Sequence, residues 1–134
     1  MCIKVSKKIS ISGWNVNGLF QKVNDTRVSK LDDIYFKHSM KSDIIFLSET
    51  HLSCKDPIVY EGYKCFSNCR SKGPSRKRGG LAVLIKRTIL NGISLIDKSV
   101  PDIMWFKLDS KVFGFKKDLY ICFYTSHLLT LLIQ

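Results

Sequence analysis

Two strand-like segments joined by one amphipathic segment constrain the fold of this chain most strongly. Residues 9–16 (ISISGWNV) alternate apolar and polar side chains, and residues 43–48 (DIIFLS) contain a short apolar run, so both predict strands. Between them, four side chains are spaced so that they would fall near one face of a helix. This spacing predicts a helix over residues 26–40, capped by Asp25 or Thr26. A strand, a helix and a second strand form a crossover unit, which predicts parallel strands in a covered sheet. The residues at helical spacing are Val28, Leu31, Tyr35 and His38.

The second half of the chain is rich in strand-like segments with short connections. These segments are residues 62–68, 81–86, 93–97, 103–109 and 118–124. Together with the helical segment they predict a mixed α/β fold. A length of 134 residues suggests one domain, and the sequence contains neither an internal repeat nor a linker.

The chain is strongly basic. It has 22 Lys and Arg against 11 Asp and Glu, which gives a formal net charge of +11. This charge favours an anionic partner, such as nucleic acid, an anionic membrane or a phosphorylated ligand. A solvated basic surface is the simpler alternative. No apolar run approaches the length of a membrane span, so we expect no membrane insertion.

The cysteines argue against a secreted disulfide scaffold. There are five of them, an odd number, and the first residues contain no apolar signal core. Cys65 and Cys69 are four positions apart, but no second pair or histidine cluster completes a zinc site. We therefore expect reduced thiols and an intracellular protein, either nuclear or cytoplasmic.

Polar side chains follow the two predicted strands of the crossover unit. Asn15 lies at the end of the first strand, and Glu49 directly follows the second. Ligands bind at the carboxyl ends of strands in α/β sheets, and neighbouring strands would bring these two residues together. A carboxylate beside a carboxamide suits Mg²⁺. The alternative is that Glu49 starts a loop and Asn15 makes a turn.

A basic segment without acidic residues connects two of the later strands. Its cations are Arg70, Lys72, Arg76, Lys77 and Arg78. Such a segment favours contact with the phosphate backbone of nucleic acid, which positions a protein without reading sequence. The alternative is an ordinary solvated loop or a nuclear-localisation patch.

Several short motifs follow one another in an order that resembles a known family. They are WNVNGL (14–19), DIIFLSETHL (43–52), GY (62–63), RGGLAVLIK (78–86), WFKLD (105–109) and LYICFY (119–124). They resemble the N-terminal half of the endonuclease/exonuclease/phosphatase family, and most closely the apurinic-endonuclease-like domain of non-LTR (LINE-type) retrotransposons. The resemblance implies the N-terminal part of a four-layer α/β sandwich over residues 9–124. Residues 1–8 would then be an extension and residues 125–134 a divergent tail.

The resemblance also implies roles for individual residues. The family nicks DNA with Mg²⁺, and Mn²⁺ is a plausible substitute; no small-molecule cofactor is expected. Glu49 matches a metal ligand, and Asn15 matches the residue that orients phosphate and metal. Asn17 would have a supporting role. His51 lies near the site in the sequence, as either a supporting polar group or a solvent-facing residue.

The printed sequence lacks the later motifs of that family. It contains no Tyr-x-Pro-Pro, no Gly-Asp-Phe-Asn and no Ser-Asp-His, which supply the remaining groups of the site. We therefore expect a truncated domain, inactive alone and binding metal weakly. The inner sheet face, with parts of LAVLI, IMWF and YICFY, would lack a partner and promote self-association. A frameshift near residues 122–124 would explain the divergent tail, since synonymous codons there can encode Tyr-Ile-Pro-Pro in another frame.

Three functions stay open at this point. The first is a fragment of a retrotransposon-type DNA endonuclease. The second is a basic nucleic-acid-binding module that kept the scaffold without catalysis. The third is a phosphatase or exonuclease of the same superfamily, against which LSETHL and the basic segment argue.

Overall fold

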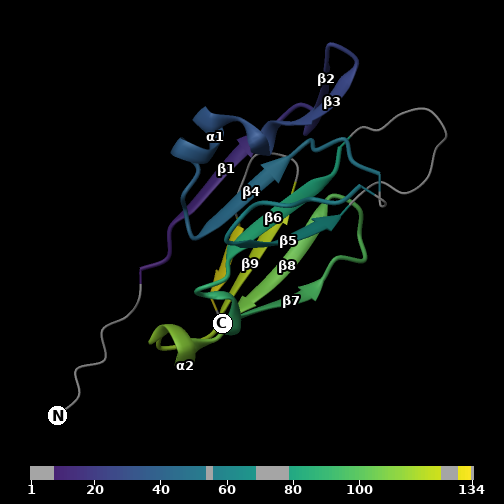
Figure 1. Cartoon of the computed structure of the whole chain (residues 1–134). Coiled ribbons are helices and arrows are strands. Elements are labelled where there is room, and N and C mark those ends of the chain that lie inside the picture. The colour runs from purple at the N-terminus through teal and green to yellow at the C-terminus, as the bar shows by residue number, and fades with distance from the viewer. Residues whose placement is uncertain (1–7, 54–55, 69–78, 125–129, 134) are drawn as a thin grey trace.

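The described part of the chain folds into two four-stranded sheets, a two-stranded hairpin and short helices (Figure 1). The computed structural model describes residues 8–53, 56–68, 79–124 and 130–133. The helical elements are η1 (Lys30–Asp32), α1 (Ile34–Ser39), η2 (Leu90–Gly92) and α2 (Ser110–Phe113). The strands are β1 (Ile11–Asn15), β2 (Phe20–Val23), β3 (Thr26–Ser29), β4 (Ile44–Ser48), β5 (Tyr63–Asn68), β6 (Leu81–Lys86), β7 (Ile93–Asp97), β8 (Ile103–Leu108), β9 (Leu119–Tyr124) and β10 (Thr130–Ile133).

The first sheet confirms the predicted parallel pair. Its strand order is β1-β4-β6-β5, and β1 runs parallel to β4 with Ile11 opposite Ile44. The other pairs of this sheet, β4 with β6 and β6 with β5, are antiparallel. The mixed α/β class predicted from the sequence is therefore confirmed.

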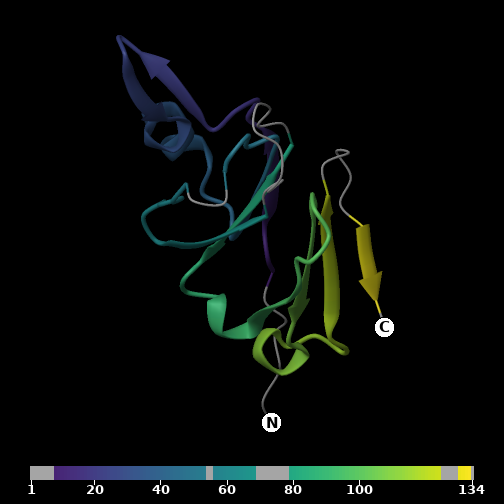
Figure 2. The ribbon, with the colours of Figure 1, turned by 90° about the vertical axis from the view of Figure 1, so that its right-hand side faces the viewer.

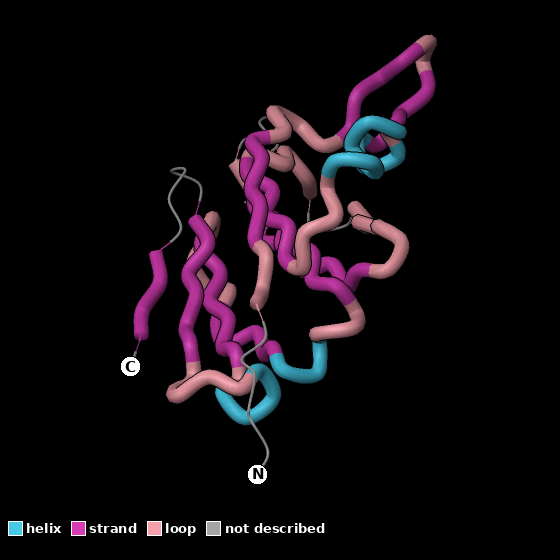
Figure 3. The backbone as a smooth tube through the Cα atoms, turned by 90° about the vertical axis from the view of Figure 1, so that its left-hand side faces the viewer, coloured by secondary structure: helices cyan, strands magenta, loops and turns pink. Residues whose placement is uncertain are grey.

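The predicted helix over residues 26–40 is wrong in its first half. Strands β2 and β3 form an antiparallel hairpin there, with Val23 opposite Thr26, and Figure 3 shows it projecting from the body of the molecule. The two intervening residues, Asn24 and Asp25, both have positive φ, as a tight hairpin turn requires. This turn signal prevails over the helical spacing.

The helix of the crossover begins later than predicted because a different residue caps it. The Asp33 carboxylate accepts hydrogen bonds from the backbone N–H groups of Tyr35 and Phe36, at 2.8 and 3.1 Å. These bonds satisfy donors that have no partner inside the helix, which fixes the start of α1 at Ile34. The crossover connection thus contains a hairpin, η1 and α1.

One hydrophobic core lies between the first sheet and the segments that cover its outer face. The rings of Trp14 and Phe36 stack with their centroids 5.1 Å apart, and Phe36 also meets Tyr60 edge-on at 5.6 Å. The buried apolar members of this core are Val16, Leu19, Leu31, Phe36, Ile45, Leu47, Leu52, Tyr60, Tyr63, Ala82 and Leu84. This packing fixes the crossover against β1 and β4.

A second hydrophobic core lies between the two sheets, which pack face to face (Figure 2). The second sheet has the order β10-β9-β8-β7, all antiparallel. Phe123 contacts Phe46 of the first sheet at a centroid distance of 5.2 Å, and Phe106 meets Phe66 at 5.3 Å. Alternate residues of β8 and β9 point into this core, so one face of the second sheet is buried.

This packing corrects the expectation of an uncovered inner sheet face. We expected that face to lack a partner, whereas β7, β8 and β9 form a separate sheet that covers β4 and β6. Consequently Leu81 through Ile85 are all fully buried. The structural reason for expecting self-association through that face is therefore wrong, while self-association itself stays a prediction.

The segment predicted as a divergent tail contributes one strand. Residues 130–133 form β10, which pairs antiparallel with β9 at the edge of the second sheet. The predicted domain boundaries stay predictions. Within the described part of the chain, no helix combines the length and the apolar character needed to cross a membrane.

Candidate functional site

Asn15 and Glu49 lie at the same edge of the first sheet. Asn15 is opposite Ser48 in the parallel register, and Glu49 is the next residue after Ser48. Backbone hydrogen bonds continue the pairing past the strand ends, with Val16 N–H donating to Ser48 O at 3.0 Å and Gly18 N–H donating to Glu49 O at 2.7 Å. The predicted neighbourhood of the two segments is therefore confirmed, while their roles stay predictions.

The side chain of Asn15 organises the loop that follows it. Its Oδ1 accepts a hydrogen bond from the backbone N–H of Asn17 at 3.0 Å. Asn17 has a φ of 45°, a left-handed conformation that asparagine tolerates better than most residues. Asn17 thus supports the loop through its backbone, and this turn was one of the alternatives that the sequence left open for Asn15.

The segment that carries Glu49 has an unusual backbone. Glu49 and His51 both have positive φ, 52° and 54°, which is uncommon for residues other than glycine. The segment is held on both sides by hydrogen bonds, to the loop after β1 and to Gly79 and Gly80 before β6. Such conformations persist only where the surroundings impose them, and they concentrate at functional sites.

His51 packs against the loop after β1. A Cβ built on Gly18, which has a φ of 87°, would lie 3.2 Å from His51 Nδ1. The histidine is only partly buried. It is therefore near the edge that carries Asn15 and Glu49, in agreement with its position in the sequence.

Two side chains at this edge carry oxygen donors of the kind that a hard cation prefers. Glu49 offers a carboxylate and Asn15 a carboxamide oxygen, and Mg²⁺ is commonly bound by one or two carboxylates with several waters retained. Among the described residues no group of three or more His, Cys, Asp or Glu could hold a metal ion. Metal binding by Glu49 and Asn15 stays a prediction.

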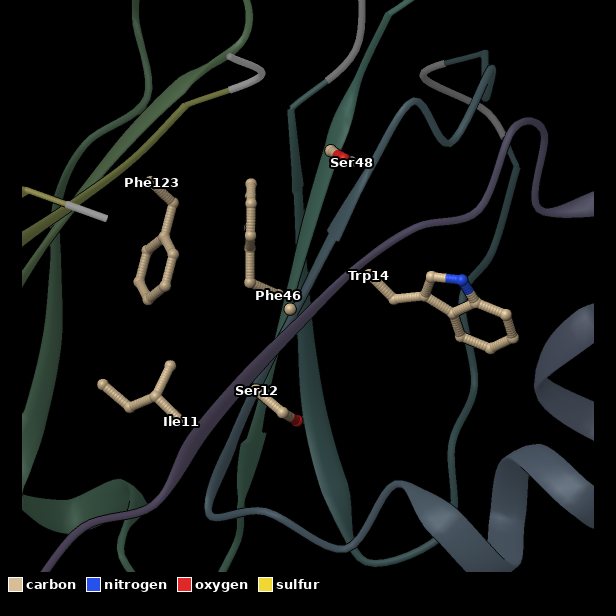
Figure 4. Close-up of a pocket in the computed structure, with 7 residues that line it drawn as sticks. Ile11, Ser12, Trp14, Phe46, Ser48 and Phe123 are labelled. Atoms are coloured by element: carbon tan, nitrogen blue, oxygen red, sulfur yellow. The ribbon is translucent and has the colours of Figure 1, made fainter. Parts of the chain in front are cut away.

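A hollow of about 330 Å³ opens between the two sheets beside β1. Figure 4 shows Phe46 and Phe123 in this space and Trp14 on the opposite side of the first sheet. The hollow is lined by Ile11, Ser12, Gly13, Trp14, Phe46, Ser48 and Phe123. None of these residues is charged, and the polar side chains among them are the hydroxyls of Ser12 and Ser48 and the indole N–H of Trp14.

A second hollow, also about 330 Å³, is lined partly by the loops that follow Asn15 and Glu49. Its lining includes basic side chains that the sequence analysis did not single out. Its lining combines Asn17 and His51 with Lys22 and Arg27 of the hairpin. Arg27 lies over the Phe20 ring, 4.0 Å from its centroid. We had placed Arg27 in a helix, and only the Asn24-Asp25 turn signal could have assigned it to the hairpin.

Arg27 also pairs with a carboxylate from a distant loop. Its guanidinium lies 3.0 Å from Asp56 Oδ1, and Asp56 accepts further bonds from the N–H and hydroxyl of Ser53. The hydrogen bond from Arg27 is the largest cause that lowers the pKa of Asp56 to about 2. Part of the positive charge of Arg27 is therefore neutralised within the protein.

The five predicted nucleic-acid-binding residues, Arg70, Lys72, Arg76, Lys77 and Arg78, lie outside the described residues. The end of that segment is described at Gly79 and Gly80. Gly79 O accepts from His51 N–H at 2.9 Å, and Gly80 O accepts from Thr50 N–H at 3.3 Å. The basic segment therefore ends beside the residues that follow Glu49.

Comparison with known proteins agrees with this architecture. Residues 13–122 match the profile of the Endonuclease/Exonuclease/phosphatase family. No curated protein matches the chain at a significant level. The profile spans β1 through β9 and includes both Asn15 and Glu49. Because the match covers most of the sequence, the chain belongs to the Endonuclease/Exonuclease/phosphatase family.

Proposed function

We propose that this chain is the N-terminal part of a Mg²⁺-dependent DNA endonuclease of the retrotransposon apurinic-endonuclease-like type. Family membership supports a nuclease or phosphatase, and members of the family generally use divalent metals. The observation that carries the proposal is the parallel β1–β4 pair, which sets Asn15 one register position from Glu49. The motifs around both residues resemble the retrotransposon branch.

In this proposal Glu49 and Asn15 bind and orient, and neither of them activates water. Glu49 would hold the cation through its carboxylate, and Asn15 would orient a phosphate oxygen through its carboxamide. A bound Mg²⁺ would polarise the scissile phosphate and stabilise the leaving oxygen. The hydrogen bond from Asn17 N–H fixes the Asn15 side chain and leaves its amide N–H groups for other partners.

Charge supports DNA as the substrate. A net charge of +11 would attract a polyanion, and the basic segment ends next to Thr50 and His51. Phosphate contacts from that segment would position a duplex without reading its sequence. Such a protein would act in the nucleus or the cytoplasm.

We further propose that the chain does not turn over DNA by itself. The printed sequence has no Gly-Asp-Phe-Asn and no Ser-Asp-His motif to activate water. General acid–base catalysis contributes roughly 10²–10⁴-fold to a rate, so its loss alone would suppress nicking. Metal binding and DNA binding would remain.

Metal titration tests the role of Glu49. Mn²⁺ binding to the full chain is measured for wild type, Glu49→Gln and the control Glu61→Gln, an exposed glutamate beside β5. We expect weak binding that Glu49→Gln reduces and Glu61→Gln does not. Equal affinities for wild type and Glu49→Gln would refute the metal role.

A nicking assay on supercoiled plasmid, with and without Mg²⁺, tests the proposed lack of turnover. We expect no nicking by any variant. Mg²⁺-dependent nicking by wild type that is lost in Glu49→Gln would show that the chain is an active enzyme.

A basic nucleic-acid-binding module without metal is the second candidate. It is favoured by the lack of any three-residue metal-binding group in the described part of the chain. DNA binding that is unaffected by Mg²⁺, together with no Mn²⁺ binding, would select this alternative.

A further inference from the structure

A buried aspartate from the connection between two strands of the second sheet contacts Gly80, the residue before β6. Asp102 lies in the connection between β7 and β8, is only 7% exposed, and has a φ of 64°. Its Oδ1 accepts a hydrogen bond from Gly80 N–H at 2.6 Å. A buried carboxylate is costly unless it is hydrogen-bonded, and bonds to a charged acceptor are the strong ones.

Gly80 is in turn hydrogen-bonded to the residues that follow Glu49. Its carbonyl accepts from Thr50 N–H, and the carbonyl of Gly79 accepts from His51 N–H. On the other side of residues 49–51, the carbonyl oxygens of Glu49 and Thr50 accept hydrogen bonds from the N–H groups of Gly18 and Leu19. The left-handed backbone of Glu49 is therefore clamped between two loops.

A second buried side chain holds the same β7–β8 connection. Asn68, the last residue of β5 and only 7% exposed, directs its Nδ2 at the carbonyl oxygens of Lys98, Val100 and Ile103, at 3.1, 2.7 and 2.9 Å. Asn68 directly precedes the basic segment, residues 69–80, and Gly79 and Gly80 are its last two residues. The β7–β8 connection therefore contacts both ends of that segment.

We propose that Asp102 is a positioning residue that fixes, through Gly80, the backbone carrying Glu49 and the end of the basic segment. The carboxylate would keep the Gly79 and Gly80 carbonyls aimed at His51 and Thr50. Asp102 contacts neither metal nor DNA in this scheme. Its consequence for metal binding rests on the proposed function, whereas its consequence for the Thr50 and His51 amides does not.

The test compares Asp102→Asn and Asp102→Ala with the matched control Asp97→Asn in the full chain. Asp97 is an exposed carboxylate at the end of β7, and the hydrogen bonds described for it come from its near neighbour Ser99. Amide hydrogen exchange is followed at Thr50 and His51. The amide of Met40, which donates to Phe36 O at the end of α1, reports on general loosening.

We expect exchange at Thr50 and His51 to accelerate about tenfold in Asp102→Ala and less in Asp102→Asn, which keeps an acceptor oxygen. Exchange at Met40 should not change, and Asp97→Asn should match wild type. If Asp102→Ala does not fold, the Asn variant decides alone. Exchange at Thr50 and His51 equal to that of the Asp97 control would overturn the proposal.

Mn²⁺ affinity separates this inference from the proposed function. We expect Asp102→Ala to weaken Mn²⁺ binding about tenfold, as loss of outer-shell partners does at metal sites. If Glu49→Gln binds Mn²⁺ as wild type does, the metal role of Glu49 is wrong, and the exchange data still decide the role of Asp102. If Glu49 binds metal but Asp102→Ala leaves both affinity and exchange unchanged, only the positioning role is wrong.

Discussion

A Cβ on Gly80 would lie 2.6 Å from the hydroxyl oxygen of Thr50, closer than such atoms approach in proteins. Gly80 also has a φ of 92°, which side chains rarely adopt. Thr50 is 1% exposed, so it has little room to move. The last residue before β6 therefore has to be glycine for the segment after Glu49 to keep its place.

Gly80→Ala should destabilise the protein by about 3 kcal/mol, because it adds a steric clash to backbone strain. The matched control is Gly62→Ala: Gly62 has a φ of 84°, but a Cβ there meets nothing within 4 Å. We expect about 1 kcal/mol for the control, from backbone strain alone. Urea denaturation measures both, and equal losses would contradict the steric argument.

Asp56 should make stability depend on pH in acid. Its hydrogen bond with Arg27 lowers the pKa from 3.8 to about 2 in the folded protein. Its contribution is therefore complete above pH 4 and is lost as the pH falls toward 2, where the carboxylate is protonated. Because the Arg27 side chain is 47% exposed, we expect only about 1 kcal/mol.

Urea midpoints of wild type and Asp56→Asn between pH 2 and 7 measure this contribution. The two proteins should differ at neutral pH and converge near pH 2. Asp32→Asn, at an exposed carboxylate of η1, controls for the change in net charge. If the urea midpoints of wild type and Asp56→Asn differ by the same amount across the whole pH range, the ion pair with Arg27 is not the source of the difference.

The face-to-face packing of the sheets predicts opposite behaviour for two neighbouring residues of β8. Phe106 is 1% exposed and packs on Phe66 and Phe123, whereas Trp105 points to the other face of the second sheet. Phe106→Ala should cost about 3–5 kcal/mol. Trp105→Ala should cost clearly less. Thermal unfolding compares them, and a larger loss for Trp105 would contradict the sheet assignment.

The basic segment should bind DNA without sequence preference and in a salt-dependent way. Replacing Arg76, Lys77 and Arg78 by Gln should flatten the slope of log affinity against log salt by about 2–3, near one unit per lost phosphate contact. Fluorescence anisotropy with a labelled duplex at several salt concentrations measures the slope.

A triple Gln replacement of Lys37, Lys41 and Lys111 is the control, since it removes the same charge from exposed positions elsewhere. An equal change of slope in both triple variants would mean that net charge, and not the segment, drives binding. An unchanged slope in the Arg76, Lys77 and Arg78 variant would exclude contact by the segment.

Local patterns determined most of the strands. The apolar runs at residues 44–48 and 81–86 and the alternating runs at 103–108 and 119–124 are strands as predicted, because these patterns have few other ways to bury apolar surface. The parallel β1–β4 pair also followed from the sequence, since a long connection between two strands favours a crossover. Asn15 and Glu49 were placed at one edge for the same reason.

Tertiary structure decided which surfaces meet. Whether β8 extends the first sheet or forms a second one depends on contacts such as Phe66 with Phe106, which lie far apart in sequence and leave no local pattern. The contact of Asp102 gave no sequence signal, because its partner Gly80 is 22 positions away in the chain. Hydrophobic patterning specifies which side chains are buried, but it is non-directional, so the partner of each buried face is determined only when the whole chain packs.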